Sequence, residues 1–94
     1  MKKLQFQSLL GMAKTMQSID REYADYWMGF QRGVRRLYHG ENFGTHEEHE
    51  QFMNCADGEY RKKLQAGYHA GYSGKRPKLP LIISRMVSGF VNYF

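Results

Sequence analysis

The sequence is poor in the features that mark secreted and membrane-spanning proteins. Its single cysteine, Cys55, excludes a disulfide within the chain and is typical of a reducing compartment. Gln and Lys interrupt the residues after the opening Met1-Lys2-Lys3, where a signal peptide needs a continuous apolar run. No stretch reaches the roughly 20 apolar residues that cross a bilayer. We therefore expect a cytoplasmic protein that does not enter a membrane.

Motifs for nucleotide binding and nucleophilic catalysis are also missing. The chain has no GxGxxG, Walker or GxSxG segment, and its 94 residues bury a core too small for a large active-site cleft. His46, His49 and Glu50 have the helical spacing of metal ligands, but no fourth ligand is evident, and we interpret them as solvated helix residues. The sequence predicts a protein that is not an enzyme and uses neither cofactor nor metal.

Charge is abundant but is divided into blocks along the chain. Residues 1–40 hold seven Lys and Arg against three acids, residues 41–59 hold six acids and no Lys or Arg, and residues 60–94 hold seven Lys and Arg and no acid. With a net charge of +5, this segregation favours an acidic partner, either nucleic acid or an acidic protein surface. The alternative is that the blocks are solvated faces that neutralise one another in the folded protein.

Helical periodicity runs through most of the chain and predicts an all-α protein. Short helices are expected at residues 4–17, 46–54 and 59–72. The clearest pattern extends from residue 18 or 20 to residue 38, where apolar positions recur at steps of three and four and define a core face. These positions are Ile19, Tyr23, Tyr26, Trp27, Phe30, Val34 and Leu37.

Two local signals predict where helices end and begin. Gly40 suits the left-handed residue that follows the last turn of a helix. Thr45 with Glu48 three residues later forms a capping box, in which the threonine hydroxyl accepts a backbone hydrogen bond at a helix start. The next helix should therefore begin at residue 46.

Four glycines inside two of the predicted helices indicate a close helix–helix contact. Gly29 and Gly33 in one segment match Gly67 and Gly71 in another, since both segments read small-Gly-aromatic-x-x-Gly-apolar. A glycine inside a helix costs about 1 kcal/mol relative to alanine, so the matched spacing implies that two backbones approach each other there. We expect a small bundle of four to five helices around a central glycine-mediated helix pair.

A basic linker and an apolar tail follow the second glycine segment. Residues 73–78 are rich in glycine, proline and cations and are expected to be extended and mobile. Residues 81–94 repeat apolar side chains at helical spacing. We expect residues 1–78 to form a helical domain and residues 79–94 a C-terminal helix that packs on this core or on a partner subunit. The apolar area of the tail favours a homodimer.

Basic side chains gather at positions suited to a binding surface. Arginines lie opposite the core face of the longest predicted helix, and further cations flank the second glycine segment. The candidate partner-binding residues are Arg32, Arg35, Arg36, Arg61, Lys62, Lys63, Lys75 and Arg76. Guanidinium groups hold phosphate with two hydrogen bonds, and the nearby Tyr38 or Tyr72 can stack on bases. The leading hypothesis is a non-enzymatic binding protein for nucleic acid or a nucleoprotein complex.

Short segments of the chain resemble known families. Residues 67–75, Gly-Tyr-His-Ala-Gly-Tyr-Ser-Gly-Lys, resemble the Gly-Tyr-x-x-Gly-x-x-Gly segment near the start of bacterial ribosome modulation factor. This resemblance implies association with the ribosome. Residues 26–36 and 39–45 resemble small uncharacterised proteins of proteobacterial phages and mobile elements. Such small proteins include anti-CRISPR inhibitors, which implies the alternative function, inhibition of a host defence complex by protein–protein binding.

Overall fold

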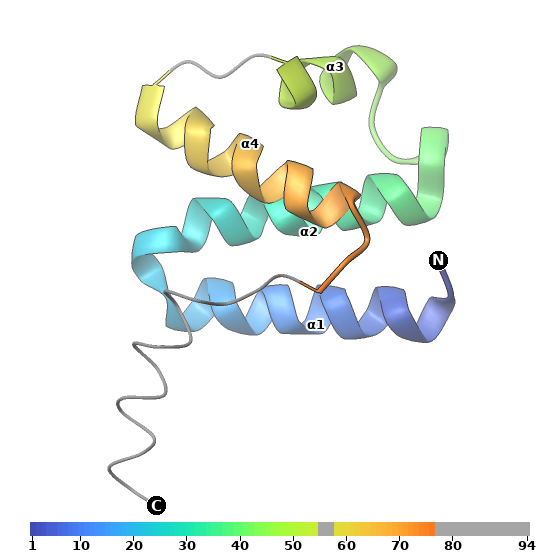
Figure 1. Cartoon of the computed structure of the whole chain (residues 1–94), viewed down its shortest axis with the longest axis horizontal. Coiled ribbons are helices and arrows are strands. Elements are labelled where there is room, and N and C mark those ends of the chain that lie inside the picture. The colour runs from blue at the N-terminus through green and yellow to red at the C-terminus, as the bar shows by residue number, and fades with distance from the viewer. Residues whose placement is uncertain (55–57, 77–94) are drawn as a thin grey trace, which may run out of the picture.

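The computed structural model describes residues 1–54 and 58–76, and this part of the chain is all-helical (Figure 1). It contains four α-helices and no strand, which confirms the predicted all-α class for these residues. The helices are α1 (Lys3–Ile19), α2 (Ala24–His39), α3 (His46–Asn54) and α4 (Gly58–Tyr72). None of these helices has the length and apolar character needed to cross a membrane. Cys55 and the expected C-terminal helix at residues 79–94 lie outside the described residues.

The core lies between α1 and α2, which run side by side in Figure 1. Each helix contributes three buried apolar positions at the three- and four-residue spacing that aligns side chains on one face. The buried side chains are Leu9, Ala13 and Met16 on α1 and Trp27, Phe30 and Val34 on α2. Burying one large apolar side chain contributes about 1.5–3 kcal/mol, so this cluster stabilises the helix pair strongly.

The prediction of one helix from residue 18 or 20 to residue 38 is wrong at its start. α1 continues to Ile19, a 3-10 turn occupies Arg21–Tyr23, and α2 begins only at Ala24. Because the chain changes direction at Asp20, helical periodicity does not carry across this point. Ile19 therefore does not belong to the core face of α2, and 52% of its surface is exposed.

α2 and α4 cross with their backbones in direct contact. A Cβ atom added to any of the four glycines that the sequence paired would overlap a carbonyl oxygen of the opposite helix. The overlapping atoms would be Leu64 O for Gly29, Tyr68 O for Gly33, Tyr26 O for Gly67 and Phe30 O for Gly71. The contact is reciprocal, since each helix contributes two glycines and receives two carbonyl oxygens. Only glycine leaves enough space for this approach.

The helix ends follow the local signals in most respects. α3 begins at His46, and the hydroxyl of Thr45 accepts a hydrogen bond from the backbone N–H of Glu48 at 3.1 Å, as the capping box predicts. Gly40 has a positive φ of 60°, but its ψ of −134° lies outside the left-handed helical region. Gly40 therefore ends α2 with the positive φ that the sequence predicted, but not in the left-handed helical conformation.

The expectation of an extended linker is wrong for residues 73–76. This segment turns at Gly74, whose φ is 72°, and lies against the N-terminal half of α1. The side chain of Gln5 donates a hydrogen bond to the Gly74 carbonyl oxygen at 3.1 Å, and Arg76 donates one to Ser8 Oγ at 2.6 Å. The segment is held because its polar groups find partners on another helix.

Candidate nucleic-acid interface

Two of the arginines that the sequence places opposite the core face of α2 contact α3 and the loop before it. Arg32 forms an ion pair with Glu48 at 2.6 Å, and the two side chains are 43% and 40% exposed. Arg36 is only 8% exposed and donates a hydrogen bond to the carbonyl oxygen of Phe43 at 3.0 Å. The prediction that Arg36 belongs to an open binding face is therefore wrong, because the acidic segment folds back over it. Arg35, between them, is half-buried.

Polar and ring contacts, rather than a buried apolar face, hold α3 in place. No residue of α3 is buried. His49 Nδ1 lies 2.6 Å from the hydroxyl of Tyr68, and the ring of Phe52 stacks on Tyr68 with centroids 4.6 Å apart. At the end of α3, the Met53 carbonyl oxygen accepts a hydrogen bond from Gln65 at 3.1 Å. These contacts join the acidic helix to α4, and the Arg32–Glu48 ion pair joins it to α2.

The histidine and carboxylate set at the start of α3 does not converge on one point. His46 Nε2 lies 3.6 Å from Glu50 Oε1, whereas His49 is turned toward Tyr68. Across residues 1–54 and 58–76, no group of three or more His, Cys, Asp or Glu residues is placed to hold a metal ion. The helical spacing alone does not make a site, because a tertiary contact takes one of its three members.

Both members of the His49–Tyr68 pair favour their neutral forms. Burial lowers the pKa of His49, and the positive charge of Arg36 lowers it further. Burial raises the pKa of Tyr68 to about 12. At neutral pH the hydrogen bond between them therefore joins an uncharged imidazole to an uncharged phenol.

Acidification is expected to destabilise the protein through His49. The unfolded chain keeps the usual pKa of 6.5 and takes up this proton before the folded chain does, which favours unfolding. The stabilisation of the folded state that depends on a neutral His49 is thus present above pH 6.5. It is lost as the pH falls through the lowered pKa of His49 in the folded state. Thermal melting of His49→Gln between about pH 7 and about pH 5 should show a smaller loss of stability than the wild type.

The control for this pH series is His46→Gln, which removes an exposed imidazole from the same helix. The quantity compared between the two variants is the slope of the melting temperature against pH. Equal slopes for His49→Gln and His46→Gln would contradict the assignment to His49.

The remaining predicted binding residues lie in two separate places. Arg61 and Lys62 are exposed near the start of α4. Lys63 is half-buried, and its ammonium group donates to the Glu22 carbonyl oxygen at 3.0 Å. Lys75 and Arg76 lie beyond the end of α4, next to α1, and are exposed. The structure thus divides the eight predicted residues among three sites instead of one face.

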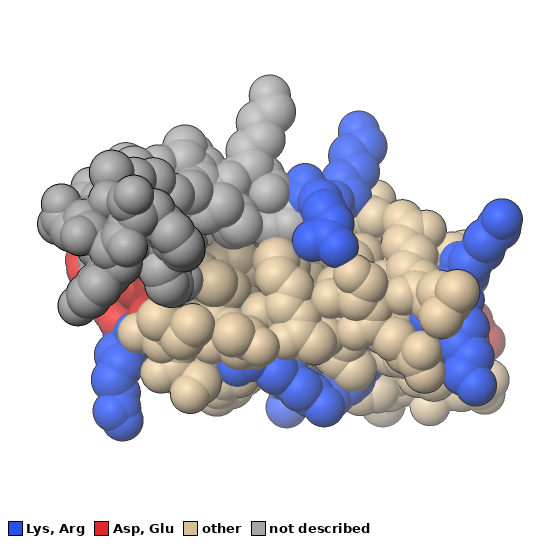
Figure 2. Space-filling model, turned by 90° about the horizontal axis from the view of Figure 1, so that it is seen from below, with Lys and Arg blue, Asp and Glu red and all other residues tan. Residues whose placement is uncertain are grey.

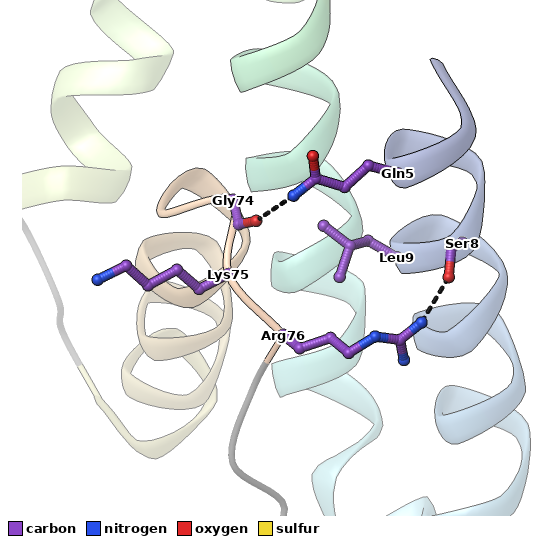
Figure 3. A pocket seen from close by; sticks show the side chains of 6 residues that line it. All are labelled: Gln5, Ser8, Leu9, Gly74, Lys75 and Arg76. Atoms are coloured by element: carbon purple, nitrogen blue, oxygen red, sulfur yellow. Dashed lines mark hydrogen bonds between the residues drawn. The ribbon is translucent and has the colours of Figure 1, made fainter. Parts of the chain in front are cut away.

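A groove of about 470 Å³ separates α1 from the segment that follows α4 (Figure 3). The lining residues are Gln5, Ser8, Leu9, Gly74, Lys75 and Arg76. The two hydrogen bonds from α1 to this segment lie at opposite ends of the groove, with Leu9 between them. Arg76 reaches across toward α1, whereas Lys75 extends away from it into solvent. The groove therefore combines cationic, amide and hydroxyl groups over a small apolar floor.

The surface around this groove carries cations without carboxylates. Residues 1–19 and 60–76 contain no Asp or Glu. Seen from below in Figure 2, the side on which α1 lies, blue Lys and Arg side chains are spread along the surface and red appears only at its edges. We define the α1 basic face by the exposed cations of residues 1–19 and of the segment that follows α4: Lys2, Lys3, Lys14, Lys75 and Arg76.

The sequence pattern indicated Lys75 and Arg76 but not Lys2, Lys3 and Lys14, which lie in α1 or directly before it. The available signal was the complete lack of acids in residues 1–19. Lys14 is eleven residues from the Lys2–Lys3 pair, so the three lysines form no local cluster in the sequence.

Comparison with known proteins does not assign the chain to a family: no family model matches it, and no curated protein or solved structure shows significant similarity to it.

Proposed function

We propose that this protein binds the phosphate backbone of nucleic acid through the α1 basic face. The observation that carries the proposal is the groove lined by Lys75 and Arg76, set in a surface whose chain segments contain no carboxylate. A surface that carries only positive charge attracts a polyanion and has no carboxylate that would repel it. An acidic protein ligand would meet the same charge, but it would not need the amide and hydroxyl groups that accompany the cations.

The groups in the groove have the chemistry of phosphate contacts. A guanidinium group binds two phosphate oxygens at once, and amide and hydroxyl side chains donate single hydrogen bonds to the backbone. Arg76, Gln5 and Ser8 supply one group of each kind. Such contacts position a nucleic acid without reading its sequence, so we expect general affinity rather than base specificity. The role is binding without catalysis, and a nucleoprotein complex such as a ribosome would present the same backbone.

Charge reversal in the groove tests this proposal. Lys75→Glu with Arg76→Glu should weaken binding to generic DNA and RNA at least about tenfold in a mobility-shift assay, because two phosphate contacts are lost. For duplex DNA, each lost contact should also reduce the slope of log K against log salt by about 0.9. Affinity of the unmodified protein should fall steeply as salt rises.

The matched control is Arg61→Glu with Lys62→Glu, which makes the same change in net charge at the other end of α4. It should retain most of the affinity. Equal losses in both double variants would show attraction by net charge alone and contradict the groove. If the unmodified protein does not bind naked nucleic acid at low salt, the alternative of a protein-directed inhibitor is favoured.

A further inference from the structure

An aromatic cluster lies beside the groove and is not explained by phosphate binding. The rings of Phe6 and Tyr38 are stacked, with centroids 4.1 Å apart and an angle of 7° between their planes. His39 meets both rings edge-on, at 5.4 Å from Phe6 and 5.0 Å from Tyr38. Phe6 and Tyr38 are half-buried and His39 is exposed, so part of the cluster faces solvent.

Two sequence neighbours of the cluster residues contact Gly74, one of the groove's lining residues. Phe6 directly follows Gln5, whose side chain is bonded to the Gly74 carbonyl oxygen. On the other side, Leu37 precedes Tyr38, and its Cδ2 atom would lie 2.8 Å from a Cβ added to Gly74. The residues that precede Phe6 and Tyr38 in the sequence, Gln5 and Leu37, therefore both lie against Gly74, which lines the groove.

The apolar core accounts for only one member of the cluster. Phe6 packs against the buried residues between α1 and α2. Within the described part of the chain, neither Tyr38 nor His39 is among the side chains that pack against this core. Their rings instead lie at the solvent-facing end of α2, beside the first turns of α1, where Lys2 and Lys3 are exposed.

A combination of rings and cations distinguishes two kinds of nucleic acid. Cations and hydroxyl groups serve equally for duplex and single strand, since both expose phosphates. Aromatic side chains add affinity only where a base is unpaired, because the faces of paired bases are already stacked inside the duplex. An aromatic cluster beside a cationic groove therefore favours a ligand whose bases are free.

We infer that the ligand of the α1 basic face is single-stranded nucleic acid, with its backbone in the Lys75–Arg76 groove and a base against the Phe6–Tyr38–His39 cluster. This inference rests on the proposed function and adds the class of ligand. Binding should be tolerant of sequence, because every base has a π face. It should also be tighter for a single strand than for a duplex of the same sequence.

The test compares one oligonucleotide in its single-stranded and duplex forms. Tyr38→Leu with His39→Gln should weaken binding of the single strand about tenfold and leave duplex binding unchanged, because only the free bases lose a stacking partner. Tyr38→Phe, which keeps the ring, should bind like the unmodified protein. Circular dichroism melting of each variant checks that the fold is retained.

A second readout does not depend on the variants. Nuclear magnetic resonance of the unmodified protein should show the ring protons of His39 shifting when the single strand is added, and not when the duplex is added. If both forms bind equally and His39 shifts with neither, this inference is wrong while the proposed function stands. If neither form binds at low salt, both are wrong.

Discussion

Gly67→Ala is expected to lower the free energy of unfolding by about 3 kcal/mol, although it adds a single methyl group. The new Cβ would overlap the carbonyl oxygen of Tyr26 and lie 2.9 Å from the backbone nitrogen of Phe30. Both are main-chain atoms of α2, which cannot move aside as a flexible side chain would. The two helices must separate, and the neighbouring glycine contacts are then lost as well. Thermal melting should show a fall of more than about 12 °C.

Gly11→Ala is the matched control for this substitution. Gly11 also lies inside a helix, but no atom lies within 4 Å of the position its Cβ would take. Alanine has the higher helix propensity, so this variant should gain up to about 1 kcal/mol. If Gly67→Ala melts at the wild-type temperature, or if both variants shift in the same direction, the close α2–α4 crossing is contradicted.

Arg36→Glu is also expected to lower the free energy of unfolding, by about 3 kcal/mol. The guanidinium group is nearly buried and donates to the Phe43 carbonyl oxygen, whereas a carboxylate cannot donate and would face that oxygen. The new negative charge would also lie in the last turn of α2, where the helix dipole disfavours it. Chemical denaturation measured by circular dichroism gives the change in free energy.

Arg61→Glu serves as the control because it reverses an exposed cation near the start of α4. This change should stay within about 0.5 kcal/mol of the wild type. Periodicity alone places Arg36 opposite the core face, where charge reversal would be harmless, so the two interpretations make opposite predictions. Wild-type stability for Arg36→Glu would restore Arg36 as a surface residue. A large loss would mean that binding defects of Arg36 variants reflect misfolding.

Much of the fold could be predicted because it depends on local chemistry. The capping box at Thr45 and Glu48 correctly located the start of α3, since this hydrogen bond spans only three residues. The apolar stripe of α2 identified Trp27, Phe30 and Val34 as core, because an α-helix repeats the same face every 3.6 residues. The boundary near residues 18–20 was expected, but the 3-10 turn at Arg21–Tyr23 was not, because Tyr23 continues the apolar period of α2.

The candidate site could be predicted only in part. Lys75 and Arg76 were identified from composition, but composition does not show that their segment folds against α1 through Gln5 and Ser8. Likewise, Phe6 and Tyr38 stack although they are far apart along the chain. Such contacts join single side chains from separate elements and leave no periodic signature in the sequence.

The sequence by itself determined which face of each helix is apolar and where backbones need space. Gly29, Gly33, Gly67 and Gly71 predicted their own contact, because the cost of glycine in a helix has few explanations other than close packing. Only the tertiary structure decided which polar surfaces remain open. Arg32 pairs with Glu48 of the acidic α3 and Arg36 is buried against Phe43 in the loop before it, whereas Lys75 and Arg76 stay exposed at the groove. The physical reason is that apolar burial repeats with the helix, while hydrogen bonds and ion pairs depend on which element folds back onto which.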